Sequence, residues 1–185
     1  RLFDRAPSGY RPGVTLEHLR RNLGVKGCQV LEAGRARFAL AGGLEFEVRE
    51  RTESQLLMHL VLCEFRLECD AVSQGTARLE AHHRGAIRRT GIGWKQKGGE
   101  AGLAQKIHQR LEQDPTLYQA LMPLDFKRLR LERGEGRWAV TLEHMGGSEV
   151  VNRMPAFRRY IRISPQQRDL LLTALMGWKR LLEGL

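Results

Sequence analysis

Arginine and lysine side chains are concentrated in two segments of this chain. The first runs over 81–99 and the second over 150–168, and neither contains an aspartate or a glutamate. The candidate anion-binding residues in them are Arg84, Arg88, Arg89, Lys95, Arg158, Arg159 and Arg162. Guanidinium groups bind phosphate and carboxylate groups through charge-assisted hydrogen bonds. The chemistry offered is therefore recognition of an anion, and the net charge of +10 favours an anionic partner without naming it.

Both basic segments read as strand, which leaves two interpretations open. Trp94 beside Lys95 and Lys97 resembles the aromatic and cationic mixture that stacks on bases. The alternative is a solvated sheet face whose arginines pair with carboxylates of neighbouring strands. The carboxylates considered for that role are Glu45, Glu47, Glu64 and Glu68. Nucleic acid is a possible partner but not the favoured one, because no helix-turn-helix, ribonucleoprotein strand or zinc finger accompanies the charge.

Like charges gathered on a sheet repel one another, and a shared anion would relieve that repulsion. We therefore predict that Arg88 or Arg89 lies close enough to Arg158 or Arg162 for both segments to hold one anion. A polyanion bound in this way would lose affinity steeply with salt.

Metal chemistry is not expected from the histidines. His82 and His83 are adjacent, so on a strand they point to opposite faces, and His144 lies near a glycine turn. Glu80 and Glu143 are the acids considered with them, but the chain has no ligand spacing typical of zinc. We predict no metal and no cofactor.

Nucleophilic catalysis has equally little support. Ser148 follows two glycines outside any Gly-x-Ser-x-Gly pattern, and Cys63 lies in an apolar run where a thiol is usually inert. Gly91 and Gly93 lack the third glycine of a dinucleotide loop. The three cysteines form no pair with disulfide spacing, which indicates buried thiols and a reducing compartment, the cytoplasm.

A fourth possibility is an apolar pocket between sheet and helices, rimmed by arginines and suited to an amphipathic anion such as a fatty acid. Its lining would come from Met58, Leu60, Leu62, Phe65, Tyr118, Met122, Met176 and Trp178. Methionine and aromatic residues at such spacings are more often ordinary core.

Alternation of apolar and polar residues predicts strands over most of the chain. After a short helix capped by Thr15 and stopped by Gly24, we expect strands over 44–49, 55–68, 76–83 and 86–95. The apolar run 56–63 reads as a buried strand, too short to cross a membrane. A hairpin is expected around Gly134-Glu135-Gly136, followed by a final strand over 157–163.

Helical periodicity predicts three further helices. The first covers 100–113, and Asp114-Pro115 begins the second. The last begins with Ser164 as cap and Pro165 in the first turn, and Gln167 completes a capping box. Its apolar stripe is Leu171, Ala174, Leu175, Trp178 and Leu182.

The order of these elements predicts an α+β fold: a mainly antiparallel sheet with helices packed on one face and a long C-terminal helix. The length of 185 residues suits a single domain over 1–185, with an irregular lead-in over 1–13. The opening residues have no signal-peptide pattern, and the start at Arg1 rather than Met suggests a trimmed chain.

Several short motifs in the sequence resemble those of a known family. They are Tyr10-Arg11-Pro12-Gly13, Pro123-Leu124-Asp125-Phe126, Gly147-Ser148-Glu149-Val150-Val151 and Pro155-Ala156-Phe157-Arg158-Arg159-Tyr160-Ile161. Together they resemble an uncharacterised bacterial family, a domain of unknown function seen mostly in proteobacteria. The resemblance covers nearly the whole chain and implies a stand-alone bacterial protein. It implies no activity, cofactor or site residue.

The leading hypothesis is a non-enzymatic module that binds an anionic partner or ligand through its arginine-rich surface. The alternatives are an enzyme that acts on a phosphorylated or carboxylated small molecule, and a module that binds an acidic protein. Perturbed carboxylates or histidines in a concave site would favour the enzyme. A broad, flat positive face would favour a nucleic acid or an acidic protein.

Overall fold

The computed structural model describes residues 5–185, so the first four residues of the predicted lead-in lie outside it. The chain forms two compact units. Unit 1 contains the described residues up to Phe65 together with Glu143–Ser164, and unit 2 contains Arg66–Leu142 and Pro165–Leu185. Each unit is described by itself.

Unit 1 combines one helix with antiparallel strands. Its elements are α1 (Val14–Leu23), β1 (Gly27–Glu32), β2 (Arg35–Ala39), β3 (Glu45–Ser54), the first part of β4 (Met58–Asp70), β9 (Ser148–Arg153) and β10 (Ala156–Ile161). Strands β1 to β4 are neighbours in sequence order, β9 pairs with β4, and β10 pairs with β9. The buried rings of Phe38, Phe46 and Phe65 contact one another in its core.

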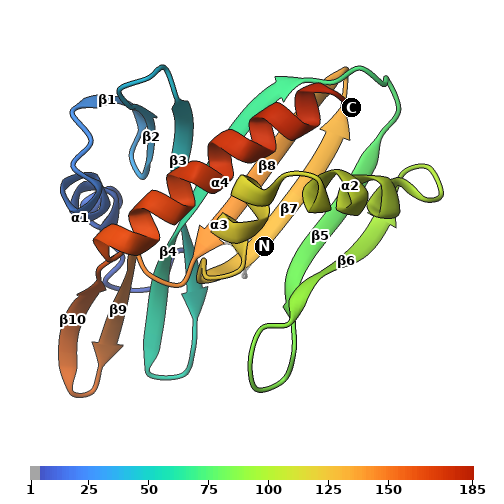
Figure 1. Ribbon diagram of the computed structural model, residues 1–185. Helices are drawn as coiled ribbons and strands as arrows, with labels where there is room; N and C mark the ends of the chain where they lie inside the picture. Colours follow the sequence, from blue (N-terminus) through green and yellow to red (C-terminus); the bar gives the residue numbers. More distant parts are fainter. Residues whose placement is uncertain (1–4) are drawn as a thin grey trace. The chain divides into compact units, whose positions relative to one another are not determined.

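Unit 2 places helices over one face of its strands (Figure 1). Its elements are the end of β4, then β5 (Ala77–Arg84), β6 (Gly91–Gly98), α2 (Leu103–Glu112), α3 (Pro115–Leu121), β7 (Phe126–Gly134), most of β8 (Arg137–His144), and α4 (Pro165–Glu183). The strand order is β8-β7-β5-β6. Trp178 of α4 is fully buried and meets Trp94 of β6 edge to face. The predicted α+β class, with its antiparallel strands and long C-terminal helix, is confirmed.

The start of α1 corrects one prediction. Thr15 is not the cap, because the helix begins at Val14. Gly13 occupies the cap position with φ +88° and has no side chain that could accept a hydrogen bond from the helix. The carboxylate of Glu50 on β3 performs this role, because it accepts the N–H groups of Gly13 and Leu16 at 2.8 Å each. A helix N-terminus has unpaired N–H groups and a partial positive charge, so a carboxylate from another strand stabilises it. Gly24 ends the helix in the left-handed conformation, as predicted.

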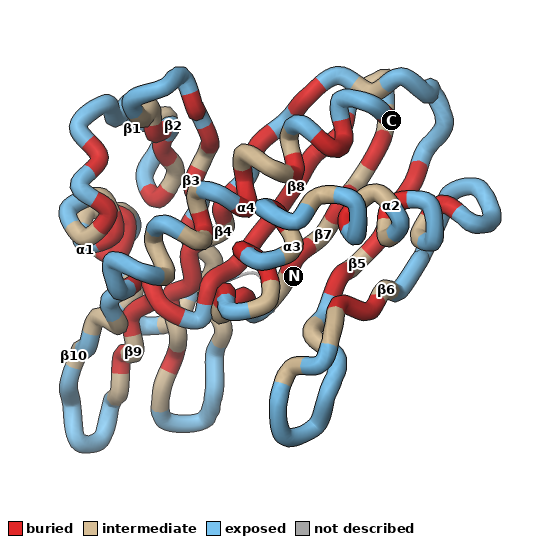
Figure 2. The backbone as a smooth tube through the Cα atoms, viewed as in Figure 1, coloured by how far each residue is buried: buried red, intermediate tan, exposed pale blue. Residues whose placement is uncertain are grey.

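Two predicted strands begin later than expected. Residues 55–57 form the β3–β4 turn, and Leu56 is 90% exposed instead of buried. Residues 85–90 form the β5–β6 turn, so Arg88 and Arg89 are loop residues. Burial alternates along strands such as β5 and β7, whereas both turns are largely exposed (Figure 2). The sequence pattern alone therefore misassigned both turns.

Other local predictions are confirmed. Glu135 and Gly136 both have positive φ in the β7–β8 turn, the geometry that joins twisted strands closely. The Asp114 side chain accepts the N–H of Leu117 at the start of α3. Helix α4 begins at Pro165, and its predicted stripe is buried. Among residues 5–185, no helix is long and apolar enough to cross a bilayer.

Candidate functional site

The face of unit 2 that lies opposite its helices is lined with cations. Along β5, buried Leu79 and Ala81 alternate with outward-facing Arg78 and Glu80. Strand β7 alternates in the same way, and its register places Arg130 directly across from Glu80. On the other side of β5, Lys95 of β6 is also opposite Glu80. We call this surface the basic face, and its residues are Arg78, Glu80, Arg84, Lys95, Lys97, Arg128, Arg130 and Glu132, the last of which lies across from Arg78.

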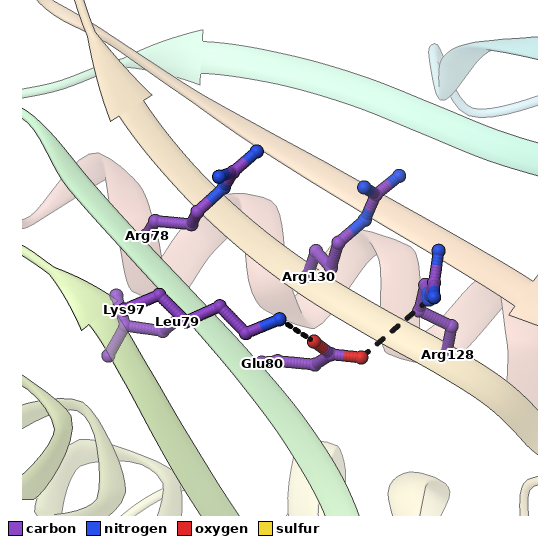
Figure 3. A pocket seen from close by; sticks show the side chains of 6 residues that line it. All are labelled: Arg78, Leu79, Glu80, Lys97, Arg128 and Arg130. Carbon is purple, nitrogen blue, oxygen red and sulfur yellow. Dashed lines mark hydrogen bonds and ion pairs between the residues drawn. The ribbon is translucent and has the colours of Figure 1, made fainter.

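A shallow hollow of about 140 Å³ lies on the basic face (Figure 3). Its lining is Arg78, Leu79, Glu80, Lys97, Arg128 and Arg130. The Glu80 carboxylate accepts a hydrogen bond from Lys97 Nζ at 2.9 Å, and its other oxygen lies 3.6 Å from Arg128 Nε. The hydrogen bond from Lys97 is the largest cause that lowers the pKa of Glu80. One ionised carboxylate is thus surrounded by four cations.

Two of those cations, Arg78 and Arg130, form no hydrogen bond or ion pair within the part of the chain that the structure describes. The Nε atom of Arg130 is buried without a hydrogen bond, and no carboxylate or carbonyl contacts the guanidinium of Arg78. Figure 3 shows the two guanidinium groups side by side above the strands. A buried guanidinium nitrogen without an acceptor is costly, so an anion would stabilise Arg130, and the exposed Arg78 offers further donors beside it.

The first predicted basic segment divides between this face and structural contacts. Arg84 and Lys95 are exposed on the basic face, and Arg88 is exposed in the β5–β6 turn. Arg89 donates to the Met122 carbonyl oxygen at 3.0 Å and to Asp125 at 2.6 Å, so it anchors its turn to the segment after α3.

The Trp94 side chain lies on the opposite face of β6 from the Lys95 and Lys97 side chains, which is not what the base-stacking interpretation requires. Its Nε1 donates to His108 Nδ1 at 3.0 Å, and its ring packs against Trp178. Side chains alternate along β6, so the indole faces the helices while both lysines face the other way.

The candidate arginines of the second predicted segment, Arg158, Arg159 and Arg162, lie in unit 1. Arg158 donates to Glu149 at 2.7 Å and to the Gly9 carbonyl oxygen, whereas Arg159 and Arg162 are exposed. Since the candidates of the first segment belong to unit 2 and those of the second to unit 1, the hypothesis that both bind one anion stays a prediction. The carboxylates that pair with the segments are Glu80, Asp125, Glu149 and Asp169, not the four that the sequence suggested.

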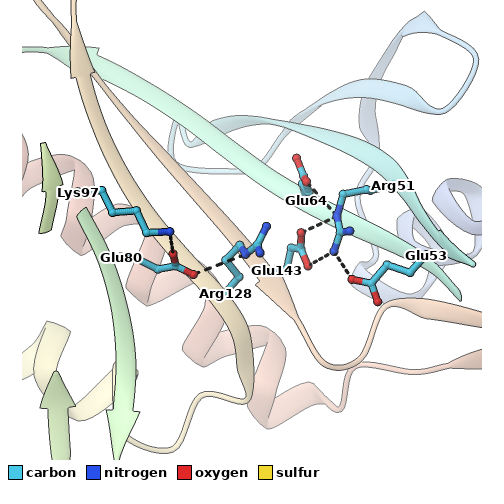
Figure 4. A network of polar contacts seen from close by, with 7 residues as sticks. All are labelled: Arg51, Glu53, Glu64, Glu80, Lys97, Arg128 and Glu143. Carbon is cyan, nitrogen blue, oxygen red and sulfur yellow. Dashed lines mark hydrogen bonds and ion pairs between the residues drawn. The ribbon is translucent and has the colours of Figure 1, made fainter. Parts of the chain in front are cut away.

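Unit 1 has an acidic network around Arg51 (Figure 4). Arg51 binds both oxygens of Glu143 at 2.9 Å, Glu53 at 2.8 Å and Glu64 at 3.3 Å. Glu143 is 1% exposed, so its charge depends on this arginine. The second group of sticks in Figure 4 is the Glu80 cluster of unit 2.

The three histidines considered for a metal site have different surroundings. His82 is exposed, whereas His83 bonds the Leu121 carbonyl oxygen at 2.9 Å and stacks on Phe126. His144 is a buried strand residue, not a loop residue, and its Nδ1 accepts the Gly146 N–H. Within residues 5–185, no group of three or more histidine, cysteine, aspartate or glutamate side chains is arranged to hold a metal.

The nucleophile candidates have structural contacts. The Ser148 hydroxyl donates to the Met145 carbonyl oxygen at 3.2 Å. Burial raises the pKa of the Cys63 thiol, so it remains protonated. Burial also raises the pKa of Cys69 to about 11. All three thiols are free, and Cys28 is exposed, which corrects the expectation of three buried thiols.

Two further candidates were the glycine pair at Gly93 and an apolar pocket. A Cβ atom at Gly93 would lie 2.5 Å from His82 Nε2. The glycine therefore allows the His82 ring to lie close to the backbone of β6, and it belongs to a strand rather than to a cofactor-binding loop. Leu117, Leu172 and Met176 line a groove of about 270 Å³ on α3 and α4. Phe65 and Trp178, proposed for a fatty-acid pocket, are fully buried packing residues.

The fold and this site define an α+β protein with a cation-rich sheet face. The chain belongs to the family described as a protein of unknown function (DUF3156), which matches residues 21–182. No curated protein and no solved structure matches it.

Proposed function

We propose that this protein is a non-enzymatic module that binds an anionic group in the hollow of the basic face. The observation that supports this function best is the buried Nε atom of Arg130, which has no hydrogen-bond partner, beside Arg78 in a hollow that also contains Lys97 and Arg128. A phosphate or carboxylate would supply the acceptors that these groups lack.

The hollow sets the size of the bound group. A volume of about 140 Å³ suits one phosphate or carboxylate rather than a whole nucleotide. Arg84 and Lys95 extend the same face along β5 and β6, so a partner with several anionic groups gains further contacts there. Free thiols and a basic surface fit a cytoplasmic protein that meets phosphorylated or acidic partners.

The alternative of an enzyme has less support at this site. A general base needs a pKa near the operating pH. Glu80 is the carboxylate of the hollow, and its pKa is lowered by Lys97. It therefore neutralises neighbouring cations better than it accepts a proton. The alternative of an acidic protein partner requires the same cations and differs only in the source of the carboxylates.

The test is a thermal-shift panel on the full chain with tripolyphosphate, a single-stranded oligonucleotide, poly-glutamate and decanoate, at about 50 mM and about 200 mM salt. We expect at least one of these anions to raise the melting temperature. The double variant Arg78→Gln with Arg130→Gln is expected to lose that rise.

The matched control removes two exposed arginines from helices, Arg21→Gln with Arg180→Gln. It carries the same change in net charge and should respond as the parent does. An equal loss in both double variants would show an effect of net charge alone. No response of the parent to any probe would also reject the proposed function.

A further inference from the structure

Two hairpin tips of unit 1 lie side by side. The β3–β4 turn comprises residues 55–57, and the β9–β10 turn comprises residues 154–155. The Arg153 N–H donates to the Leu57 carbonyl oxygen at 2.9 Å, and Met58 pairs with Asn152 in the strand register. These contacts hold the two tips together as one end of the unit, where Figure 1 shows them next to each other.

Large apolar side chains project from both tips. Leu56 is 90% exposed, Met154 76%, Leu57 52% and Phe157 48%. We call these four residues the tip patch. Figure 2 shows the ends of both hairpins as exposed. Apolar side chains clustered at a protruding end, with no core beneath them to fill, are typical of an interaction surface.

The two segments that form the tip patch carry only positive charge. Residues 54–63 and 150–163 contain no aspartate or glutamate. Arg153 and Arg159 are exposed, and their side chains have no partner among residues 5–185. Three acids flank the two segments. Glu149 pairs with Arg158, and Glu53 and Glu64 contact Arg51, which also binds Glu143.

We propose that the tip patch docks onto the surface of an anionic lipid bilayer. Leucine, methionine and phenylalanine side chains enter the boundary between headgroups and acyl chains, and nearby arginines bind lipid phosphates. Protruding turns suit this insertion, because their apolar side chains can reach the boundary between headgroups and acyl chains while the backbone groups of the turn stay among the hydrated headgroups. This inference goes beyond the proposed function and uses residues of the other unit.

A nucleic acid fits the patch less well, because base stacking uses flat rings and three of the four side chains are aliphatic. A second copy of the chain would meet the same uncompensated arginines across a symmetric contact, where like charges repel. An anionic bilayer satisfies both the apolar and the cationic part of the surface.

Flotation of the full chain with vesicles tests this directly. The vesicles contain phosphatidylcholine alone, or phosphatidylcholine with about 30 mol% phosphatidylglycerol. We expect the parent to float with the anionic vesicles, and Leu56→Gln with Met154→Gln to bind about tenfold more weakly. Because both side chains are exposed, the variant should unfold at the parent's temperature.

A matched control removes two other exposed apolar side chains. Val30 and Val72 are each 71% exposed and lie outside both tips. The variant Val30→Gln with Val72→Gln should float as the parent does. The variant Arg153→Gln with Arg159→Gln should lose the preference for anionic vesicles while the apolar tips are intact.

Three results would overturn the proposal. The first is no flotation of the parent at about 50 mM salt. The second is equal flotation of the tip-patch variant and the valine control. The third is parent self-association or oligonucleotide binding that the tip-patch variant loses while flotation is unchanged, which would assign the patch to a protein or nucleic-acid partner.

Discussion

Arg51 of β3 binds the buried carboxylate of Glu143 through two hydrogen bonds, from Nε to Oε1 and from Nη2 to Oε2, each 2.9 Å long. Glu143 is 1% exposed, so water cannot replace the arginine as its partner. The two residues are distant in sequence yet form one of the strongest polar contacts of unit 1.

Loss of that contact should be costly. The variant Arg51→Met leaves a buried carboxylate without its bidentate partner, and we expect the free energy of unfolding to fall by about 3 kcal/mol. Urea unfolding measures the change. The control Arg37→Met breaks an exposed pair with Glu47 at 3.5 Å and should cost less than about 1 kcal/mol. Equal losses in the two variants would contradict a special role for the buried pair.

Glu50 rather than Thr15 should determine the stability of the start of α1. The Glu50 carboxylate accepts hydrogen bonds from Tyr10 Oη, Gly13 N and Leu16 N, each at 2.8 Å. A glutamine has one acceptor oxygen, so Glu50→Gln should lower the free energy of unfolding by about 1–2 kcal/mol. Thr15→Val, which keeps the shape of a buried side chain, should change it less. The reverse order would restore Thr15 as the cap.

Close packing at Gly177 should reverse the usual benefit of alanine in a helix. A Cβ atom there would lie 2.9 Å from Leu117 Cδ1 and 3.1 Å from Leu117 Cβ, and Leu117 is fully buried. Alanine gains up to about 1 kcal/mol in helix propensity over glycine. Overpacking costs about 1–3 kcal/mol, so Gly177→Ala should be destabilising. In a Leu117→Ala background, which removes Cδ1 and keeps Cβ, the same change should be less destabilising, and urea unfolding of all four proteins measures the difference.

His59 should make stability depend on pH. It is fully buried, neither ring nitrogen has a hydrogen-bond partner in residues 5–185, and burial followed by Arg158 lowers its pKa. The unfolded chain then binds more protons below the ordinary histidine pKa of about 6.5. Stability is therefore retained above that value and lost as the pH falls, by at most about 1.4 kcal/mol per pH unit.

The variant His59→Leu removes this titration without removing a hydrogen bond. Its free energy of unfolding should fall less than that of the parent between neutral and mildly acidic pH. His82→Gln replaces an exposed histidine and should keep the parent's pH dependence. The same pH dependence in His59→Leu and the parent would show that His59 is not the group responsible.

Sequence periodicity was enough where local rules decide the structure. Helix α4 begins at Pro165 and buries Trp178 and Leu182 because apolar residues repeat at the helical period. Asp114 caps α3, and the turn at Glu135 needs only short-range backbone geometry. The antiparallel α+β class follows from such elements, since residues close together in the sequence determine the hairpins and the order of strands and helices.

Tertiary structure decided the turns, the cap and the cation partners. Leu56 and Leu57 look like strand core in the sequence, but burial depends on which side chains another segment covers, and none covers Leu56. Glu50 caps a helix that begins 36 residues before it, which no local pattern indicates. Arg158 has a buried acid beside it, whereas Arg78 and Arg130, outside the predicted cluster, face a hollow. Charge is a property of the sequence, but the partner of each charge depends on strand register and long-range packing.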